Sequence, residues 1–376
     1  MRVLLTGGGT AGHINPALAI ADIVKQNIPS AEILFVGIRG GKEEDLVPRE
    51  GYTLRYVKAR GIDRSIFTLG NVKAIWLAAK EPYSKQTTSI LDEFKPDIVI
   101  GTGGYACWPI MSAAARRKIP TALHESNALP GLAIRMLQKK VDRVWINFEK
   151  TASLLKVKDR VVRVGNPLRS AFGSLSYQEA RARLGIGQEQ TLVLSFGGSL
   201  GAEQLNRAAV EMMDAITESD RSVIYMHATG KLGYQATKEK FESLKLDRRA
   251  GCVLTDYIYD MPLRMAAADI VISRAGAMTL SELARLGKAA ILIPSPNVVD
   301  NHQLLNAKTL ADAGAAILVE ESELASGALT QAVCALLREP KQRQALQAQI
   351  GSFAGPDANR IIYSEILHLT KKREIK

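Results

Sequence analysis

The feature that most constrains the fold is a strand, a glycine loop and a helix that occur in this order twice in the chain. In the first copy the apolar run 2–6 precedes Gly8-Gly9-Thr10-Ala11-Gly12. In the second copy the run 191–195 precedes Gly197-Gly198-Ser199-Leu200-Gly201. After each copy, short apolar runs alternate with helical patterns, which is typical of parallel sheets with crossover helices. We therefore predict an α/β fold with two Rossmann-like, doubly wound domains.

A chain of 376 residues is longer than a single hydrophobic core usually supports, so two domains are expected. The turn cluster Gly165-Asn166-Pro167 gives the best boundary. We predict an N-terminal domain at 1–165 and a C-terminal domain at 166–376, with the amphipathic helix after Pro356 able to pack back on the first domain. Two such domains facing each other leave a central cleft, where the glycine loops follow the carboxyl ends of the strands.

Charge and cysteine content narrow the class of protein. Lys and Arg number 49 against 38 Asp and Glu, and a net charge of +11 favours phosphates, nucleic acid or an acidic membrane as partners. The three cysteines lie far apart, as in a cytosolic protein with reduced thiols. The chain shows no signal peptide, and its longest uncharged run, 98–115, is interrupted by glycine and proline. We expect a soluble or peripheral protein.

The first glycine loop, Gly7 to Gly12, matches the G-x-G-x-x-G pattern, in which backbone N–H groups approach a diphosphate. A nicotinamide dinucleotide is disfavoured, because the second strand ends Val36-Gly37-Ile38-Arg39 without the acidic residue that would hold a ribose. His13 follows the loop. Two roles fit this position equally. The side chain is either a general base or a residue at the start of the helix that hydrogen-bonds to the backbone or to a phosphate.

A second loop in the first half, Gly101-Thr102-Gly103-Gly104-Tyr105, also follows a buried strand. The segment His124-Glu125-Ser126-Asn127 is expected to lie at the same cleft. For His124 and Glu125 we favour a local network of hydrogen bonds over a role in chemistry.

In the second half, residues 274–282 join a strand to a helix. One interpretation places phosphates on the helix N-terminus and a ribose on Glu282; the other is that Thr279 and Glu282 form a capping box. The polar cluster Asp300-Asn301-His302-Gln303 is suited to sugar hydroxyls or to an ordinary helix cap. No Asp-x-Asp pair occurs in the sequence, so helix N-termini and Arg or Lys are expected to neutralise a diphosphate without a metal.

One stretch combines apolar and basic residues and is interpreted as core or as a patch resting on an anionic bilayer. Its members are Ile66, Phe67, Leu69, Val72, Ile75, Trp76, Leu77 and Tyr83 with Arg64, Lys73, Lys80 and Lys85, and Lys139 and Lys140 are expected nearby.

Taken together, these motifs resemble a known family. The matching segments are Gly8 to His13, Gly103-Gly104-Tyr105, His124 to Asn127, Gly165-Asn166-Pro167, Gly197-Gly198-Ser199-x-Gly201, Arg274 to Glu282 and Asn301-His302-Gln303-x-x-Asn306. Their order and spacing resemble the MurG family of bacterial N-acetylglucosaminyltransferases, from Leu4 to about Glu320.

The resemblance implies a GT-B fold and an inverting transfer of N-acetylglucosamine from UDP-N-acetylglucosamine to undecaprenyl-diphospho-N-acetylmuramoyl-pentapeptide (lipid I). The product is lipid II, used in peptidoglycan synthesis. It further implies a peripheral enzyme on the cytoplasmic side of the cell membrane. The expected partners are UDP-N-acetylglucosamine, lipid I and an anionic membrane surface, with no nucleic acid, no cofactor and no metal.

The resemblance also implies roles for individual residues. The uracil contact is Ile258 through its backbone, the diphosphate contacts are Ser199 and Arg169, the ribose contact is Glu282, and the sugar contact is Gln303. The turn that frames phosphate and ribose comprises Ala277, Met278, Thr279, Leu280, Ser281 and Glu282, and the N-terminal half contributes Thr10, Ala11, Gly12 and Asn127. We predict His13 as the base that deprotonates the 4-hydroxyl of the acceptor sugar.

The sequence departs from the family pattern at Ala11, where a glycine is common, and at Ser126, where many members have glutamine. A methyl group at position 11 is tolerated only where the backbone needs no positive φ. Three other functions stay open: a related transferase with a different acceptor, a UDP-sugar epimerase, and a non-catalytic sugar-nucleotide or membrane-scaffold protein. An acceptor-dependent turnover assay distinguishes them.

Overall fold

The computed structural model describes residues 1–60, 80–198, 202–217, 222–298, 301–355 and 357–374. The chain forms two compact units, one of residues Met1–Ser170 with Gly355–Lys376 and the other of Ala171–Ala354. Each unit has its own sheet and its own core, and each is described by itself.

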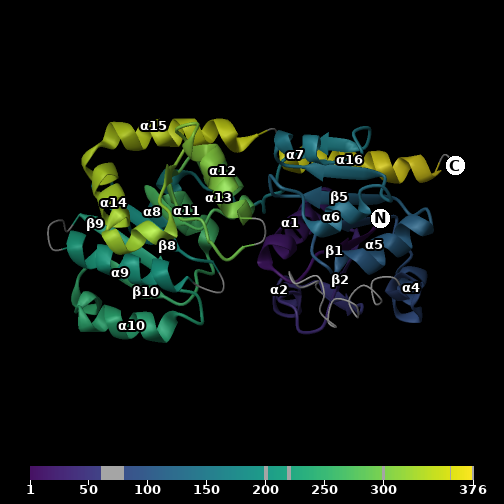
Figure 1. The fold of residues 1–376 in the computed structure, drawn as a ribbon, viewed down its shortest axis with the longest axis horizontal. Coiled ribbons are helices and arrows are strands. Elements are labelled where there is room, and N and C mark those ends of the chain that lie inside the picture. The colour runs from purple at the N-terminus through teal and green to yellow at the C-terminus, as the bar shows by residue number, and fades with distance from the viewer. Residues whose placement is uncertain (61–79, 199–201, 218–221, 299–300, 356, 375–376) are drawn as a thin grey trace. The chain divides into compact units, whose positions relative to one another are not determined.

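The first unit, which carries the labels β1, β2 and β5 in Figure 1, has a parallel sheet. Its seven strands have the order β3-β2-β1-β4-β5-β6-β7. Its strands are β1 (Arg2–Thr6), β2 (Glu32–Gly37), β3 (Thr53–Tyr56), β4 (Ile98–Gly101), β5 (Thr121–Glu125), β6 (Arg143–Ile146) and β7 (Val161–Arg163). Its helices are α1 (Ala11–Asn27), α2 (Glu43–Arg49), the 3₁₀ turn η1 (Glu81–Tyr83), α4 (Lys85–Phe94), α5 (Cys107–Arg116), α6 (Leu132–Leu137), α7 (Glu149–Leu154) and α16 (Ala358–Glu374).

The core of this unit lies on both faces of the sheet. One cluster joins the strands to α1 and α16, and the other joins them to α4, α5 and α6. The C-terminal helix α16 buries Ile362 and Ile366 in the first cluster. Its Glu365 also accepts a hydrogen bond from the indole N–H of Trp145 at 3.3 Å. Helix α16 is therefore part of the core of the first unit, although it comes last in the chain.

The second unit has a six-stranded parallel sheet in the order β10-β9-β8-β11-β12-β13. Its strands are β8 (Thr191–Phe196), β9 (Val223–Ala228), β10 (Cys252–Thr255), β11 (Ile270–Ser273), β12 (Ala289–Leu292) and β13 (Ile317–Leu318). Its helices are α8 (Tyr177–Leu184), α9 (Glu203–Thr217), α10 (Tyr234–Ser243), η2 (Leu246–Arg248), α11 (Met261–Ala267), α12 (Ala277–Leu286), α13 (His302–Ala311), η4 (Glu321–Ser326), α14 (Ala328–Arg338), α15 (Pro340–Gly351) and η5 (Ser352–Ala354).

Both sheets are wholly parallel, and their strands are joined by helical crossovers, so the predicted α/β fold with two doubly wound sheets is confirmed. In both, the first strand of the unit lies inside the sheet, and the strand order reverses beside it. Ligands of such sheets bind at this switch point, beyond the carboxyl ends of the strands.

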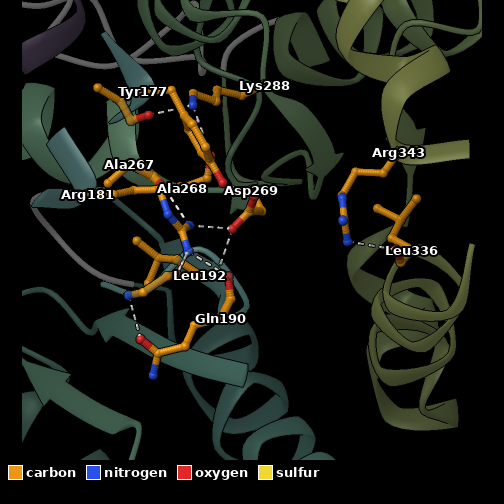
Figure 2. Close-up of polar contacts among 12 residues, drawn as sticks. Tyr177, Arg181, Gln190, Leu192, Ala267, Ala268, Asp269, Lys288, Leu336 and Arg343 are labelled. Atoms are coloured by element: carbon orange, nitrogen blue, oxygen red, sulfur yellow. Dashed lines mark hydrogen bonds and ion pairs between the residues drawn. The ribbon is translucent and has the colours of Figure 1, made fainter. Parts of the chain in front are cut away.

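A buried ionic cluster in the second unit lies at the opposite, amino-terminal ends of its strands (Figure 2). Arg181 donates to Asp269 Oδ2 at 2.9 Å and to the carbonyl oxygen of Gln190 at 2.6 Å. Asp269 also accepts from the backbone N–H of Leu192 and from the hydroxyl of Tyr177. Lys288 donates to the carbonyl oxygens of Ala266 and Ala268 at the end of α11. These contacts fix the edge of the sheet that faces away from the glycine loop.

Candidate functional site

The first glycine loop leads from β1 to the N-terminus of α1. Thr10 is the extended N-cap residue, with φ −135°, and Ala11 is the first residue of the helix. Ala11 is not among the residues with positive φ, so its backbone accommodates a methyl group without strain. The backbone N–H groups of Ala11 and Gly12 make no hydrogen bond within the described part of the chain. They are donors at the positive end of a 17-residue helix, which suits an anion.

His13 stands in the first turn of α1, half-buried. Its Nδ1 lies 3.2 Å from the hydroxyl oxygen of Thr10, and its carbonyl oxygen accepts a hydrogen bond from Thr102 Oγ1 at 2.6 Å. The imidazole is thus tethered on one nitrogen, and its backbone is joined to the second glycine loop.

The second glycine loop packs directly on the first. Gly103 and Gly104 have φ values of +105° and +79°. A Cβ atom at Gly103 would lie 2.9 Å from Cδ2 of His13, and one at Gly104 would overlap the carbonyl oxygen of Gly8. Glycine is therefore required at both positions for two reasons. The backbone is left-handed, and the two loops approach each other too closely for a side chain.

The segment after β5 forms the local network that we favoured from the sequence. His124 is fully buried, and its Nε2 lies 2.9 Å from the carbonyl oxygen of Gly165. Burial lowers the pKa of His124 to about 4, so the ring is neutral at pH 7. Glu125 accepts hydrogen bonds from the backbone N–H and the side-chain amide of Asn127, and from the N–H of Gly131. Burial raises the pKa of Glu125. Glu125 therefore holds Asn127 beyond the end of β5.

In the second unit, the turn 274–276 leads from β11 into α12. The N-cap is Gly276, with no side-chain hydrogen bond, and the helix begins at Ala277. Thr279 therefore lies inside the first turn, and the capping box that would have explained Glu282 is not formed. The side chains of Thr279, Ser281 and Glu282 are half-buried, whereas those of Ala277, Met278 and Leu280 are buried.

Two further contacts hold this turn in place. Arg274 donates to the carbonyl oxygens of Ile293 and Pro294 and forms an ion pair with Glu321. Asn306, on α13, donates to the carbonyl oxygen of Ala275 at 3.3 Å. The turn is thereby joined to the end of β12 and to the helix that carries Gln303.

The amide oxygen of Gln303 accepts a hydrogen bond from the backbone N–H of Ser295 at 2.9 Å. This contact orients the amide of Gln303, because its oxygen is held by the backbone. Ile258, in the turn after β10, is buried. Ser199 lies outside the described residues, and so does most of the apolar-basic stretch, residues 61–79.

Arg169 belongs to the first unit, whereas the other donor-site residues predicted in the second half belong to the second. Its guanidinium forms an ion pair with Glu50 at 2.6 Å. The next residue, Ser170, donates to Asp22 of α1 through both its N–H and its hydroxyl. The end of the first unit is thus fixed on α1 and on the end of α2.

His227, which lies on β9, was not predicted from the sequence. Its Nδ1 lies 2.7 Å from Ser195 Oγ on β8, and its Nε2 lies 3.0 Å from Asn206 Oδ1 on α9. Burial lowers the pKa of His227 to about 4. The side chain joins the strand before the second-unit glycine loop to the helix after it. A polar residue inside the apolar run 223–228 was the signal available in the sequence.

Two doubly wound units, each with a glycine turn that opens onto a helix N-terminus at the carboxyl edge of its sheet, are the architecture of the GT-B fold, in which many glycosyltransferases are built. Family models agree with this class: the glycosyltransferase family 28 N-terminal domain matches residues 3–146, and the glycosyltransferase family 28 C-terminal domain matches residues 192–359. The chain belongs to glycosyltransferase family 28 and, within it, to the MurG transferases, as the comparisons with individual proteins show.

The UDP-N-acetylglucosamine–N-acetylmuramyl-(pentapeptide) pyrophosphoryl-undecaprenol N-acetylglucosamine transferase of Acetivibrio thermocellus is 41% identical over 375 residues, 99% of each chain. The crystal structure of MurG from Acinetobacter baumannii is 25% identical, with a TM-score of 0.73 over 98% of this chain and 99% of that one. A UDP-GlcNAc 2-epimerase from Neisseria meningitidis, 16% identical, aligns with a TM-score of 0.66 over 98% of this chain and 100% of that one, and shares the fold alone. The resemblance inferred from the motifs is confirmed.

Proposed function

We propose that this enzyme transfers N-acetylglucosamine from UDP-N-acetylglucosamine to lipid I and releases UDP and lipid II. The observation that carries the proposal is the 41% identity with the Acetivibrio thermocellus transferase over 99% of both chains. The geometry supports it, because both units present a helix N-terminus at the edge of the sheet where a diphosphate binds. Donor and acceptor each carry a diphosphate, so the substrates need two such sites.

The donor is assigned to the second unit. The backbone of Ile258 contacts uracil, Glu282 accepts from the ribose hydroxyls, and Gln303 donates to the sugar. The N-terminal turn of α12, with Thr279 and Ser281, takes the phosphates together with Ser199. Support comes from the half-buried Glu282, whose alternative role in a capping box is absent from the structure. Arg169 joins the diphosphate by exchanging its Glu50 partner for a phosphate.

The acceptor is assigned to the first unit, where Thr10, Ala11 and Gly12 take its diphosphate and Asn127 contributes to the site. His13 removes the proton from the 4-hydroxyl of the acceptor sugar. That oxygen forms a bond to the anomeric carbon as the bond to UDP breaks on the opposite face, which inverts the configuration. Helix N-termini and Arg169 stabilise the departing diphosphate.

The turnover assay uses labelled UDP-N-acetylglucosamine and a short-chain lipid I analogue, with and without EDTA. Equal transfer of label to the lipid in both samples is the expected result. Transfer that EDTA abolishes would overturn the metal-free mechanism. Binding of UDP without transfer would overturn the acceptor assignment, and a new sugar nucleotide formed without acceptor would indicate an epimerase.

We further infer that the enzyme acts as a peripheral protein on the anionic, cytoplasmic face of the membrane. Within the described residues, no helix has the length and apolar character needed to cross a bilayer. Helix α6 exposes Leu132 and Met136 next to the basic residues Arg135, Lys139 and Lys140. The ammonium of Lys140 lies 5.5 Å from the ring of Trp108, which follows the second glycine loop. This patch suits headgroup contact close to the acceptor loops.

Sedimentation with vesicles containing anionic lipid tests the patch. Leu132→Ser combined with Met136→Ser is expected to reduce the bound fraction several-fold, since two exposed apolar anchors are removed. The control is Leu232→Ser, a change at a leucine that is 81% exposed on the second unit. Equal binding by the double variant and the wild type would contradict the assignment of this patch.

A further inference from the structure

The first glycine loop is hydrogen-bonded to the buried carboxylate of Glu43. Its side chain is fully buried at the start of α2. Oε2 accepts a hydrogen bond from the N–H of Gly9 at 3.1 Å, and Oε1 accepts one from the N–H of Ile38 at 3.0 Å. One donor follows β1 and the other follows β2, so this side chain ties together the ends of two neighbouring strands.

Three glycines make room for this carboxylate. A Cβ atom added at Gly37 would lie 2.5 Å from Cγ of Glu43, and one at Gly41 would lie 2.5 Å from its Cδ. One at Gly8 would lie 2.9 Å from Cδ. Among the described residues, Glu43 has no ion-pair partner. Burying a carboxylate without a cation costs folding free energy. Three glycines thus leave the space that the Glu43 side chain fills beneath the loop backbone.

The contact with Gly9 determines which donors of the loop remain for a substrate. Because the Gly9 N–H is bound to Glu43, it is not available to a diphosphate. The left-handed Gly9, with φ +85°, then turns the chain so that Thr10 is the extended N-cap, and the N–H groups of Ala11 and Gly12 remain at the start of the helix. Gly9 also lies close to the ring of Tyr105, whose Cε1 would be 3.0 Å from a Cβ at that position. Glu43 and Tyr105 therefore both constrain the loop at Gly9.

We infer that Glu43 is a positioning residue for the acceptor half of the reaction, which orients the first glycine loop, the N-terminus of α1 and His13 without touching the substrate. This inference rests on the proposed function. The inference is tested by the kinetics of transfer to the lipid acceptor. Binding of UDP to the second unit, which Glu43 does not belong to, is the reference measurement.

The test is Glu43→Gln, which keeps the size of the side chain. One of the two acceptor oxygens becomes an NH₂ group, which cannot accept a hydrogen bond from the backbone N–H that faces it. The expected result is a loss of roughly ten- to hundred-fold in kcat/KM for the lipid I analogue, since displacement of a reacting group by about 1 Å has effects of this size. The KM for UDP-N-acetylglucosamine and the Kd of UDP are expected to be unchanged. Glu43→Asp, which keeps both acceptor oxygens on a shorter side chain, is expected to be intermediate.

A matched control exists in the same unit. Glu81 is also buried, and its Oε1 accepts from the N–H of Lys58 and from the hydroxyls of Ser84 and Thr87. Glu81→Gln is expected to lower the melting temperature without altering the acceptor kinetics.

The inference is overturned if Glu43→Gln has wild-type acceptor kinetics, or if Glu81→Gln produces the same acceptor defect at the same loss of stability. If Glu43→Gln does not fold, Glu43→Asp carries the same comparison. Failure of the wild-type enzyme to transfer label to the lipid would instead contradict the proposed function, so the two outcomes are distinguishable.

Discussion

The imidazole of His13 packs against Gly103, at a distance that leaves no space for a side chain between the two glycine loops. A Cβ atom at Gly103 would lie 2.9 Å from Cδ2 and 3.1 Å from Nε2 of the ring. Since Nδ1 is close to the hydroxyl of Thr10, the ring is confined on two sides. The position of the proposed base is thus set by a glycine that lies 90 residues further along the chain.

Substituting Gly103 by alanine should therefore impair turnover through His13. The methyl group must displace the ring, and the backbone at φ +105° is also strained for alanine. We expect kcat to fall by roughly ten- to hundred-fold, with the Kd of UDP unchanged. Gly185→Ala is the matched control, because Gly185 also has positive φ, at +68°, but has no atom within 4 Å of its Cβ position. Equal activity of the two variants would show that the ring does not need this position.

Replacing Glu282 by alanine should weaken binding of the nucleotide. A hydrogen bond to a charged carboxylate is worth about 1.5–3 kcal/mol, so the Kd of UDP should rise by roughly ten- to hundred-fold. Calorimetry with UDP and with 2′,3′-dideoxy-UDP distinguishes the loss of a ribose contact from a structural effect of the substitution on α12. The dideoxy compound lacks the hydroxyls that Glu282 accepts from, so its Kd should be the same for variant and wild type. A loss of equal size for both ligands would assign Glu282 to the structure of α12 instead.

Much of the fold follows from local sequence. Apolar runs that end in glycine predict strands at the start of each half, and the structure has β1 and β8 there. The interpretation of Glu282 as part of a capping box was plausible because the spacing from Thr279 is right. The structure places the start of the helix two residues before Thr279, and a pattern of spacing does not define that start.

The residues that support the site were much harder to foresee. Glu43 stands in a run of three acidic residues, Glu43-Glu44-Asp45, which is typical of an exposed helix start. Its role depends on Gly9, 34 positions away, and the ion pair between Arg169 and Glu50 joins residues 119 positions apart. Such contacts are set by the strand order of the sheet, and no short window of sequence contains them.

The buried histidine His124 should make the first unit sensitive to acid. Its pKa is about 4 in the folded chain and 6.5 when unfolded, so between these values the unfolded state binds the proton and the folded state does not. The stability is fully present above pH 6.5 and is lost as the pH falls toward 4, by about 3 kcal/mol.

Urea unfolding followed by tryptophan fluorescence at pH 7, 6 and 5 measures this effect. All three tryptophans, Trp76, Trp108 and Trp145, precede residue 171, so the signal reports the first unit. His124→Gln is expected to flatten the dependence on pH. His227→Gln, which alters the second unit, is expected to leave this signal unchanged, and an equal effect of both variants would contradict the assignment to His124.

The ionic cluster around Asp269 should dominate the stability of the second unit (Figure 2). Arg181→Met leaves Asp269 buried without its cation, which costs about 3–5 kcal/mol in a pair of this kind. Lys238→Met breaks an exposed pair with Glu242 and should cost less than about 1 kcal/mol. Adding Asp269→Asn to Arg181→Met removes the unpaired charge and should restore part of the loss; if it restores none, the loss comes from packing and not from charge. Because the cluster lies at the amino-terminal ends of the strands, away from the turn that carries Glu282, the folded variants should bind UDP as the wild type does.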